Sequence, residues 1–422
     1  MIPTRRAFLR GAAGGLASLA LPPAVARAAA VVPAASGFSA AHRVLDDAVA
    51  VGGHVGAVLA IVRGGRVVDW HVAGHADVAR TRRLRRDAIF RIQSMSKPIA
   101  SAAALMLVES GALRLDDPVS RHVPAFADVR VVHGGSVDAP LLRAPSRPPT
   151  VRDLLSHKAG LPAGLPGDDV AAALLERTGA YGADRLQAFA DRLARAPLAA
   201  DPGTRFGYDG VATELLSRVV EVASGRRFAT FVQARILRPL GMADTGFEVP
   251  ASKRDRIVEL STVDGMGRVV PAAASAAPPA GERMRRWDSG AGGLYSTAAD
   301  YARFAGLLLG GGTLDGTTLL APGTVRLMAT DQLAALPPAR ARPGTGEGFG
   351  LGVGIVVDPA ARGGDAPAGT FGWTGAMSTA FSIDPSHGLA IVLMQQYLPV
   401  DGGRGLRKPW RTVQDAVQAA VR

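Results

Sequence analysis

The sequence predicts an α/β fold of the α+β type, in which strands from both chain ends form one antiparallel sheet flanked by helices. Two pairs of apolar runs, each joined by a short turn-rich segment, lie near opposite ends of the 422-residue chain. Such pairs are typical of β-hairpins. Helical patterns dominate the segment between them, so we expect a mostly helical subdomain inserted between the two halves of the sheet.

The terminal elements follow from alternating apolar runs and from amphipathic spacing. The N-terminal strands are joined by Arg63-Gly64-Gly65-Arg66, and the C-terminal strands by Asp384-Pro385-Ser386-His387-Gly388. The predicted strands are residues 55–62, 67–73, 379–383 and 389–395, and the predicted helices packed with them are residues 38–50 and 412–421.

The middle of the chain is predicted to be helical, with helices at residues 99–109, 215–223 and 228–237. A further helix is expected after Thr297, since Thr297 and Asp300 have the spacing of a capping box. We therefore expect one catalytic domain over residues 29–422. Its sheet subdomain would span about 38–95 and 345–422, and its helical subdomain about 96–344.

The first 28 residues have the pattern of a twin-arginine signal peptide. Arg5 and Arg6 precede a weakly hydrophobic stretch at residues 11–21, and small residues surround Ala28. The stretch is too short for a stable membrane anchor. A disordered basic tail is the alternative, but the pattern favours export to the periplasm or the medium. The chain has no cysteine, which excludes disulfides and thiol catalysis.

The formal charge of +12 raises the question of an anionic partner. An arginine-rich run at residues 80–86 is a candidate patch, but it lies between strand-like segments and contains no aromatic residue. A solvated loop is therefore the favoured interpretation, and no nucleic acid is expected. His71 and His75 are four residues apart but lie on a strand and its exit, so no metal site is expected.

The segment Ser94-Met95-Ser96-Lys97 carries the chemistry. Side chains three residues apart are neighbours on a helix, so Ser94 and Lys97 can touch. An amine that takes its proton turns a serine hydroxyl into a nucleophile. The chain has only four lysines among 48 basic residues, and an arginine at this position would stay protonated. The alternative is that Ser94 merely caps the helix that follows.

The chain resembles the serine β-lactamase-like hydrolases, which include class C β-lactamases, D-alanyl-D-alanine carboxypeptidases and family VIII-type esterases. The resemblance rests on the order and spacing of several motifs. These are Phe90-Arg91-Ile92-Gln93-Ser94-Met95-Ser96-Lys97, residues 115–119 and 154–161, Pro202-Gly203-Thr204 with Tyr208, and residues 239–242 and 292–297.

The resemblance implies roles for two more segments. Tyr208 would face Ser94 and share the role of general base with Lys97, because a neighbouring ammonium favours the phenolate. Trp373-Thr374-Gly375-Ala376 would lie on an edge strand beside the nucleophile. The backbone N–H groups of Ala376 and Ser94 would then form the oxyanion hole.

Two departures from the family pattern bear on the substrate. Gly210 stands where the lactamases and peptidases usually have Asn, and Trp373 stands where they usually have Lys or His. Both changes weaken recognition of β-lactams and peptides, so the favoured function is a serine hydrolase acting on small esters, without metal or cofactor. A β-lactamase or D,D-peptidase and a non-catalytic envelope binding protein remain alternatives. The oligomeric state does not follow from the sequence.

Overall fold

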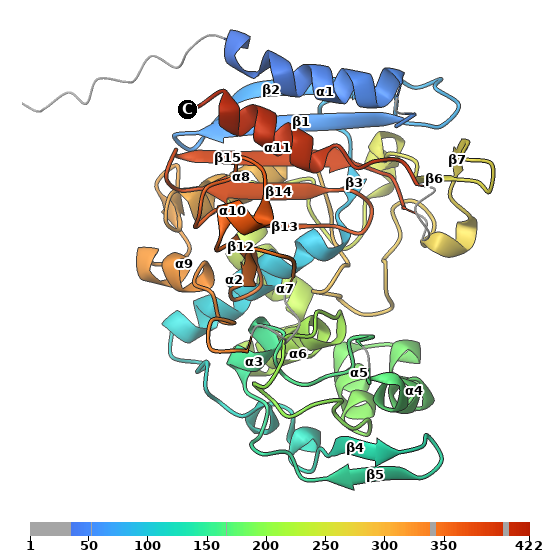
Figure 1. Ribbon diagram of the computed structural model, residues 1–422, viewed down its shortest axis with the longest axis vertical. Coiled ribbons are helices and arrows are strands. Elements are labelled where there is room, and N and C mark those ends of the chain that lie inside the picture. The colour runs from blue at the N-terminus through green and yellow to red at the C-terminus, as the bar shows by residue number, and fades with distance from the viewer. Residues whose placement is uncertain (1–34, 52, 166, 338–342, 400–404) are drawn as a thin grey trace, which may run out of the picture. The chain divides into compact units, whose positions relative to one another are not determined.

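A seven-stranded antiparallel sheet in the order β11-β12-β13-β14-β15-β1-β2 is the centre of the fold in the computed structural model (Figure 1). The structure describes residues 35–51, 53–165, 167–337, 343–399 and 405–422, so the predicted signal peptide lies outside the described residues. The strands are β1 (Gly56–Arg63), β2 (Arg66–Gly74), β11 (Glu347–Phe349), β12 (Gly354–Val356), β13 (Phe371–Thr374), β14 (Ala380–Asp384) and β15 (Leu389–Gln395).

The two chain ends meet inside this sheet, as predicted from the hairpins. Strand β1 pairs with β2 on one side and with β15 on the other, so that Ala60 lies opposite both Trp70 and Val392. The β14–β15 hairpin then continues the sheet through Phe381, which also pairs with Val392. The sheet therefore contains strands from both ends of the chain, which confirms the predicted fold class.

Helices cover both faces of the sheet. Helices α1 (Ser39–Ala50) and α11 (Trp410–Ala419) pack on one face with Leu59 and Ile61 of β1. Helix α8 (Ala298–Leu309) packs on the other face, where Val58 and Val62 of β1 are buried. Side chains alternate between the two faces of a strand, so a strand covered on both faces is apolar throughout.

The remaining helices lie in the middle of the chain, as predicted, except for α10 (Pro359–Arg362), which falls within the range expected for the sheet subdomain. They are α2 (Ser96–Glu109), α3 (Val151–Leu155), α4 (Asp169–Arg177), α5 (Leu186–Leu193), α6 (Val211–Ser224), α7 (Phe228–Val232), α9 (Pro322–Met328) and α10 (Pro359–Arg362). Helix α2 is buried from Ser96 to Leu107 and packs against α6. A helix that is apolar all round needs such a central position, and this position fixes the segment that carries Lys97.

Several local predictions need correction. The helix expected at residues 228–237 is α-helical only to Val232 and continues as a π-helical turn, Gln233–Leu237. The capping box before α8 is only half formed: the Thr297 side chain accepts from the Asp300 N–H, but the Asp300 carboxylate binds Thr245 and the Asp244 N–H.

Short strand pairs outside the main sheet were not predicted, since runs of two to five residues carry little periodicity. They are β3 (Phe90–Arg91) with β8 (Tyr295–Ser296), β4 (Val131–Gly135) with β5 (Pro140–Arg143), β6 (Ser261–Val263) with β7 (Val269–Pro271), and β9 (Thr313–Leu314) with β10 (Thr317–Thr318).

The expected division into two subdomains also differs from the packing in one respect. Helix α8 lies within the range expected for the helical subdomain, yet it packs on the sheet. One hydrophobic cluster includes Val58 of the sheet, Leu105 of α2, Leu215 of α6 and Phe304 of α8. Sheet and helices therefore share a core. Among the described residues, no helix is both long and apolar enough to span a membrane.

Candidate active site

Ser94 lies in a tight turn directly before α2. The turn, Gln93–Met95, is a 3₁₀ helix, and α2 starts at Ser96. Gln93 has a φ of 46°, a left-handed conformation that is uncommon for a residue with a side chain. The turn is held by the Tyr301 hydroxyl, which donates to the Met95 carbonyl at 2.8 Å. As predicted, the half-buried Ser94 is therefore placed at the N-terminal end of a helix.

Lys97 contacts Ser94 in the way that the helical spacing predicts. Its Nζ lies 3.2 Å from Ser94 Oγ and donates to the Ala291 carbonyl at 2.9 Å. The lysine is only 3 % exposed. A buried amine fixed by two oxygen atoms has little freedom of movement, so the Ala291 carbonyl keeps Nζ beside the nucleophile.

Tyr208 completes the group of predicted catalytic side chains. Lys97 Nζ lies 5.0 Å from the centroid of the Tyr208 ring. On the far side, Trp373 Nε1 donates a 2.9 Å hydrogen bond to the Tyr208 hydroxyl. Phe349 packs between these elements, 5.0 Å from Trp373 by ring centroids. The structure therefore brings Ser94, Lys97, Tyr208 and Trp373 together from three separate segments, because Ser94 and Lys97 share one.

The third predicted motif lies at the end of β13, and its expected place on an edge strand is wrong. Strand β13 lies between β12 and β14. However, β12 pairs only with Phe371 and Gly372, because it is just three residues long. Trp373 and Thr374 therefore have no strand partner on the side of β12. Only this C-terminal end of β13 is accessible in the way expected of an edge strand.

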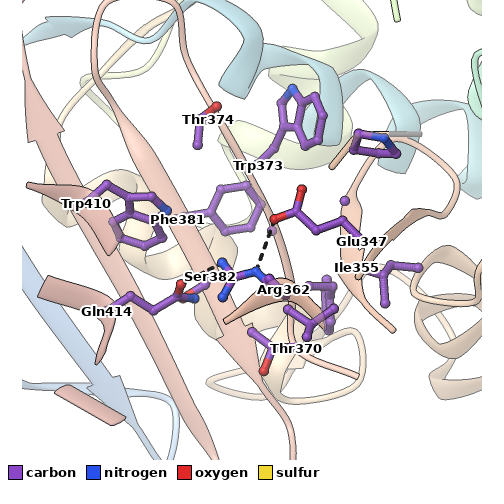
Figure 2. Close-up of a pocket in the computed structure, with 15 residues that line it drawn as sticks. Glu347, Ile355, Arg362, Thr370, Trp373, Thr374, Phe381, Ser382, Trp410 and Gln414 are labelled. Atoms are coloured by element: carbon purple, nitrogen blue, oxygen red, sulfur yellow. Dashed lines mark hydrogen bonds and ion pairs between the residues drawn. The ribbon is translucent and has the colours of Figure 1, made fainter. Parts of the chain in front are cut away.

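Gly375 packs closely against neighbouring backbone. A Cβ at this position would lie 2.4 Å from the Ile92 carbonyl oxygen, so glycine is needed for close backbone packing against the segment before Ser94. Ala376 lines the same pocket as Ser94. Thr374 does not line this pocket but a second cavity, between strands β12 to β14 and helix α11 (Figure 2).

The pocket around Ser94 has a volume of about 790 Å³. Small apolar residues from Ala274 to Pro278 form part of its wall, together with Met284, Met377 and Leu398. Such a volume is in the range of small-molecule sites. The pocket also contains polar side chains that the sequence did not indicate, namely Glu214, Arg285 and Tyr181.

Glu214 on α6 is the most unusual of these groups. It is 4 % exposed, and burial raises its pKa to about 7 despite the opposing effects of the Ser289 hydrogen bond and the Lys97 and Arg285 charges. Ser289 Oγ donates to Glu214 Oε1 at 2.5 Å. The only signal in the sequence was a carboxylate at the apolar spacing of α6, three residues after Val211.

His157 lies beneath Tyr208, with ring centroids 4.8 Å apart. Its side chain is 1 % exposed, and its Nδ1 lies 3.7 Å from Asp209 Oδ2. Burial lowers the pKa of His157, and the Lys97 charge lowers it further, although Asp209 acts in the opposite direction. A neutral His157 ring therefore packs against Tyr208 and supports it from below.

The arginine-rich segment and the histidine pair, which the sequence raised as candidate anion and metal sites, do not line this pocket. The arginine-rich segment 80–86 is exposed except for Leu84. His71 binds Asp46 at 2.8 Å and stacks on His42. Within the described ranges, no group of three or more His, Cys, Asp or Glu side chains is arranged to hold a metal ion.

Comparison with known proteins gives the family. The sequence profile of the family described as "Beta-lactamase" matches residues 41–413. The chain is 32 % identical over 373 residues to "Esterase EstB" of Burkholderia gladioli, which covers 83 % of this chain and 88 % of the relative. It is 28 % identical over 218 residues to the D-alanyl-D-alanine-carboxypeptidase/endopeptidase AmpH of Escherichia coli K12, covering 52 % of this chain and 48 % of AmpH.

A solved structure agrees with this assignment. EstCE1, described as a hydrolase with promiscuous acyltransferase activity, superposes with a TM-score of 0.72 at 25 % identity. The superposition covers 91 % of this chain and 98 % of EstCE1. With a profile match over most of its length and a site that joins Ser94, Lys97 and Tyr208, the chain belongs to the β-lactamase family of hydrolases.

Proposed function

We propose that this protein is a carboxylic ester hydrolase that acts through an acyl-enzyme on Ser94. The observation that carries the proposal is the hydrogen bond from Trp373 Nε1 to the Tyr208 hydroxyl. A lysine at position 373 would offer a cation for a substrate carboxylate. The indole offers no charge, and its one N–H is already bound to Tyr208. A neutral ester loses nothing from this change.

Acylation begins with attack of Ser94 Oγ on the ester carbonyl. Lys97 Nζ, 3.2 Å from Ser94 Oγ, and Tyr208 together take the proton of Ser94 and pass it to the leaving alcohol. Negative charge develops on the carbonyl oxygen during this step. The backbone N–H groups of Ser94 and Ala376 are the donors that we assign to it.

Deacylation reverses the proton transfers. A water molecule attacks the acyl-enzyme, gives its proton to the Lys97–Tyr208 pair and releases the acid, while Ser94 recovers its hydroxyl. A second alcohol can replace the water, in which case the product is a new ester. The similarity to EstCE1 supports including acyl transfer to alcohols in the proposal.

The pocket supports a substrate with a short apolar acyl or alcohol part. Alanine and proline side chains at residues 274–278 and the side chain of Met377 form part of its wall. Gly210 offers no side-chain amide to a substrate's acylamino group. The 32 % identity to an esterase over most of both chains points to the same substrate class.

The test compares wild-type protein with Ser94→Ala on p-nitrophenyl butyrate and on nitrocefin. Ester turnover that is lost in Ser94→Ala, with little nitrocefin turnover, is the expected result. Strong nitrocefin turnover would favour the β-lactamase or D,D-peptidase alternative. Failure of Ser94 to react with a fluorophosphonate probe, together with no turnover, would favour a binding protein.

We also propose that residues 1–28 direct twin-arginine export. Replacing Arg5 and Arg6 by lysine is expected to leave the protein in the cytoplasm, as measured by cell fractionation with the ester assay. Unchanged export of this variant would contradict the proposal.

A further inference from the structure

Lys97 is held by a turn, the Ser289 turn, that is itself attached to helix α6. This turn spans residues 289–293 and is closed by a hydrogen bond from the Gly293 N–H to the Ser289 carbonyl at 2.9 Å. Ala291, in the middle of the turn, supplies the carbonyl that accepts from Lys97 Nζ at 2.9 Å. The position of Nζ therefore depends on what fixes this turn.

Glu214 of α6 holds the Ser289 turn through a side-chain hydroxyl. Ser289 Oγ donates to Glu214 Oε1 at 2.5 Å and accepts from the Gly292 N–H at 3.3 Å. Glu214 is 4 % exposed and Ser289 is 2 % exposed, so the hydrogen bond between them lies in a low-dielectric environment, where it is strong. The hydroxyl thus links a carboxylate on a helix to the backbone directly beside Ala291.

Other contacts fix the chain on either side of this turn. Before the turn, Asp288 Oδ2 lies 3.3 Å from Arg227 Nη2. After the turn, the Leu294 N–H donates to Ser96 Oγ of α2 at 3.2 Å. Removing the Ser289 hydroxyl should therefore leave the segment folded, and the change should be confined to the residues between these two anchors.

Glu214 also titrates near neutral pH. Burial raises its pKa to about 7, while the Ser289 hydrogen bond and the charges of Lys97 of α2 and Arg285 act in the opposite direction. Tyr181 is a further titratable neighbour: burial raises its pKa, and the Glu214 charge contributes. Charge-assisted hydrogen bonds are about twice as strong as neutral ones. The carboxylate should therefore hold the turn more tightly as the pH rises through about 7.

We propose that Glu214 is a positioning residue for acyl transfer, because it fixes Lys97 through the Ser289 turn. The carboxylate orients the Ser289 hydroxyl, and that hydroxyl keeps the Ala291 carbonyl in place. The carbonyl in turn holds Nζ within 3.2 Å of Ser94 Oγ. That Lys97 takes the proton of Ser94 rests on the proposed function, whereas the restraint on Nζ does not.

The test measures how fast a fluorophosphonate probe labels Ser94 in the full-length protein at about pH 5.5 and about pH 8.5, on either side of the Glu214 pKa of about 7. Glu214→Gln keeps a neutral acceptor for Ser289. The wild type is therefore expected to react about as fast as Glu214→Gln at the lower pH, and about tenfold faster at the higher pH.

A direct effect of the Glu214 charge on Lys97 predicts the opposite result. Removing a negative charge near the amine would favour its neutral form, so Glu214→Gln would be labelled faster than the wild type at the higher pH. That result, or equal rates at both pH values, would overturn the proposal.

Ser289→Ala removes the link and leaves the carboxylate in place. At the higher pH it is expected to be labelled about tenfold more slowly than the wild type. Adding Glu214→Gln to it should change the rate no further, because two changes that break one shared contact are not additive. Fully additive effects would contradict the proposal. Glu221→Gln on the same helix is the matched control: Glu221 pairs with Arg218 at 3.1 Å, so this variant should react like the wild type.

Crystal structures of the wild type and of Ser289→Ala give a readout that depends on no reaction. In Ser289→Ala the Ala291 carbonyl is expected to lie beyond about 3.5 Å from Lys97 Nζ, outside hydrogen-bond distance. An unchanged distance of 2.9 Å would show that Glu214 does not position the amine. If the wild type reacts neither with the probe nor with esters, the proposed function fails, and these structures alone decide the role of Glu214.

Discussion

Replacing Glu214 by Gln tests the electrostatics of the catalytic pocket most directly. Burial raises the pKa of Glu214 from its ordinary value of 4.5 to about 7 in the folded protein. Between these two values the folded state keeps a proton that the unfolded state has lost, so stability falls as the pH rises. At about 1.4 kcal/mol per pKa unit, the loss between pH 4.5 and 7 is about 3 kcal/mol. Above pH 7 Glu214 is ionised in both states, so the free energy of unfolding no longer falls for this reason.

The Gln variant has no proton to lose, and its amide oxygen can still accept from Ser289 Oγ. Its free energy of unfolding, measured by urea denaturation between pH 4.5 and 8, is therefore expected to lack this decline. Glu221→Gln on the same helix is the control, because Glu221 pairs with Arg218 at 3.1 Å. Glu221→Gln is expected to change the free energy of unfolding by the same amount at every pH in this range. Parallel curves for wild type and Glu214→Gln would refute the reasoning.

Three further predictions concern the catalytic group. Trp373→Phe removes the N–H donor to Tyr208 but keeps an aromatic ring; kcat for the ester is expected to fall about tenfold with KM nearly unchanged. Lys97→Met preserves the buried volume and should lower kcat by on the order of 10² to 10⁴, while the circular dichroism spectrum stays that of the wild type. Gly375→Ala forces a Cβ against backbone 2.4 Å away, so both activity and melting temperature should drop, whereas Gly265→Ala, with open space around it, should change neither.

The elements that could be predicted from the sequence are those whose signals are local. The hairpin β1–β2 follows from two apolar runs around a Gly-Gly turn, and it forms within one residue of the predicted bounds. The contact between Ser94 and Lys97 follows from helical spacing alone. The family pattern added Tyr208, which lies against Lys97 as the resemblance implied.

Features that depend on tertiary packing could not be predicted in this way. The pKa of Glu214 is raised because α6 is buried against α2, and an isolated helical pattern does not identify the face on which a carboxylate will be enclosed. The position of β13 within the sheet depends on β12, a strand too short to have a detectable pattern. Arg362 is one of many arginines in the sequence, and only tertiary contacts, such as those with Glu347 of β11 and Gln414 of α11, distinguish its buried side chain from the others.

The same distinction explains how the active site is assembled. Ser94 and Lys97 are three residues apart, but the carbonyl that holds Lys97 belongs to Ala291, 194 residues away. Trp373, whose indole N–H donates to the Tyr208 hydroxyl, lies 165 residues after Tyr208. A Ser-x-x-Lys motif in an unrelated helix has neither support, so its lysine can rotate into solvent. The motif therefore indicates a catalytic site only when the loop that contains Ala291 and the end of β13 are both in place. Variants of these supporting residues should reduce turnover before they weaken substrate binding.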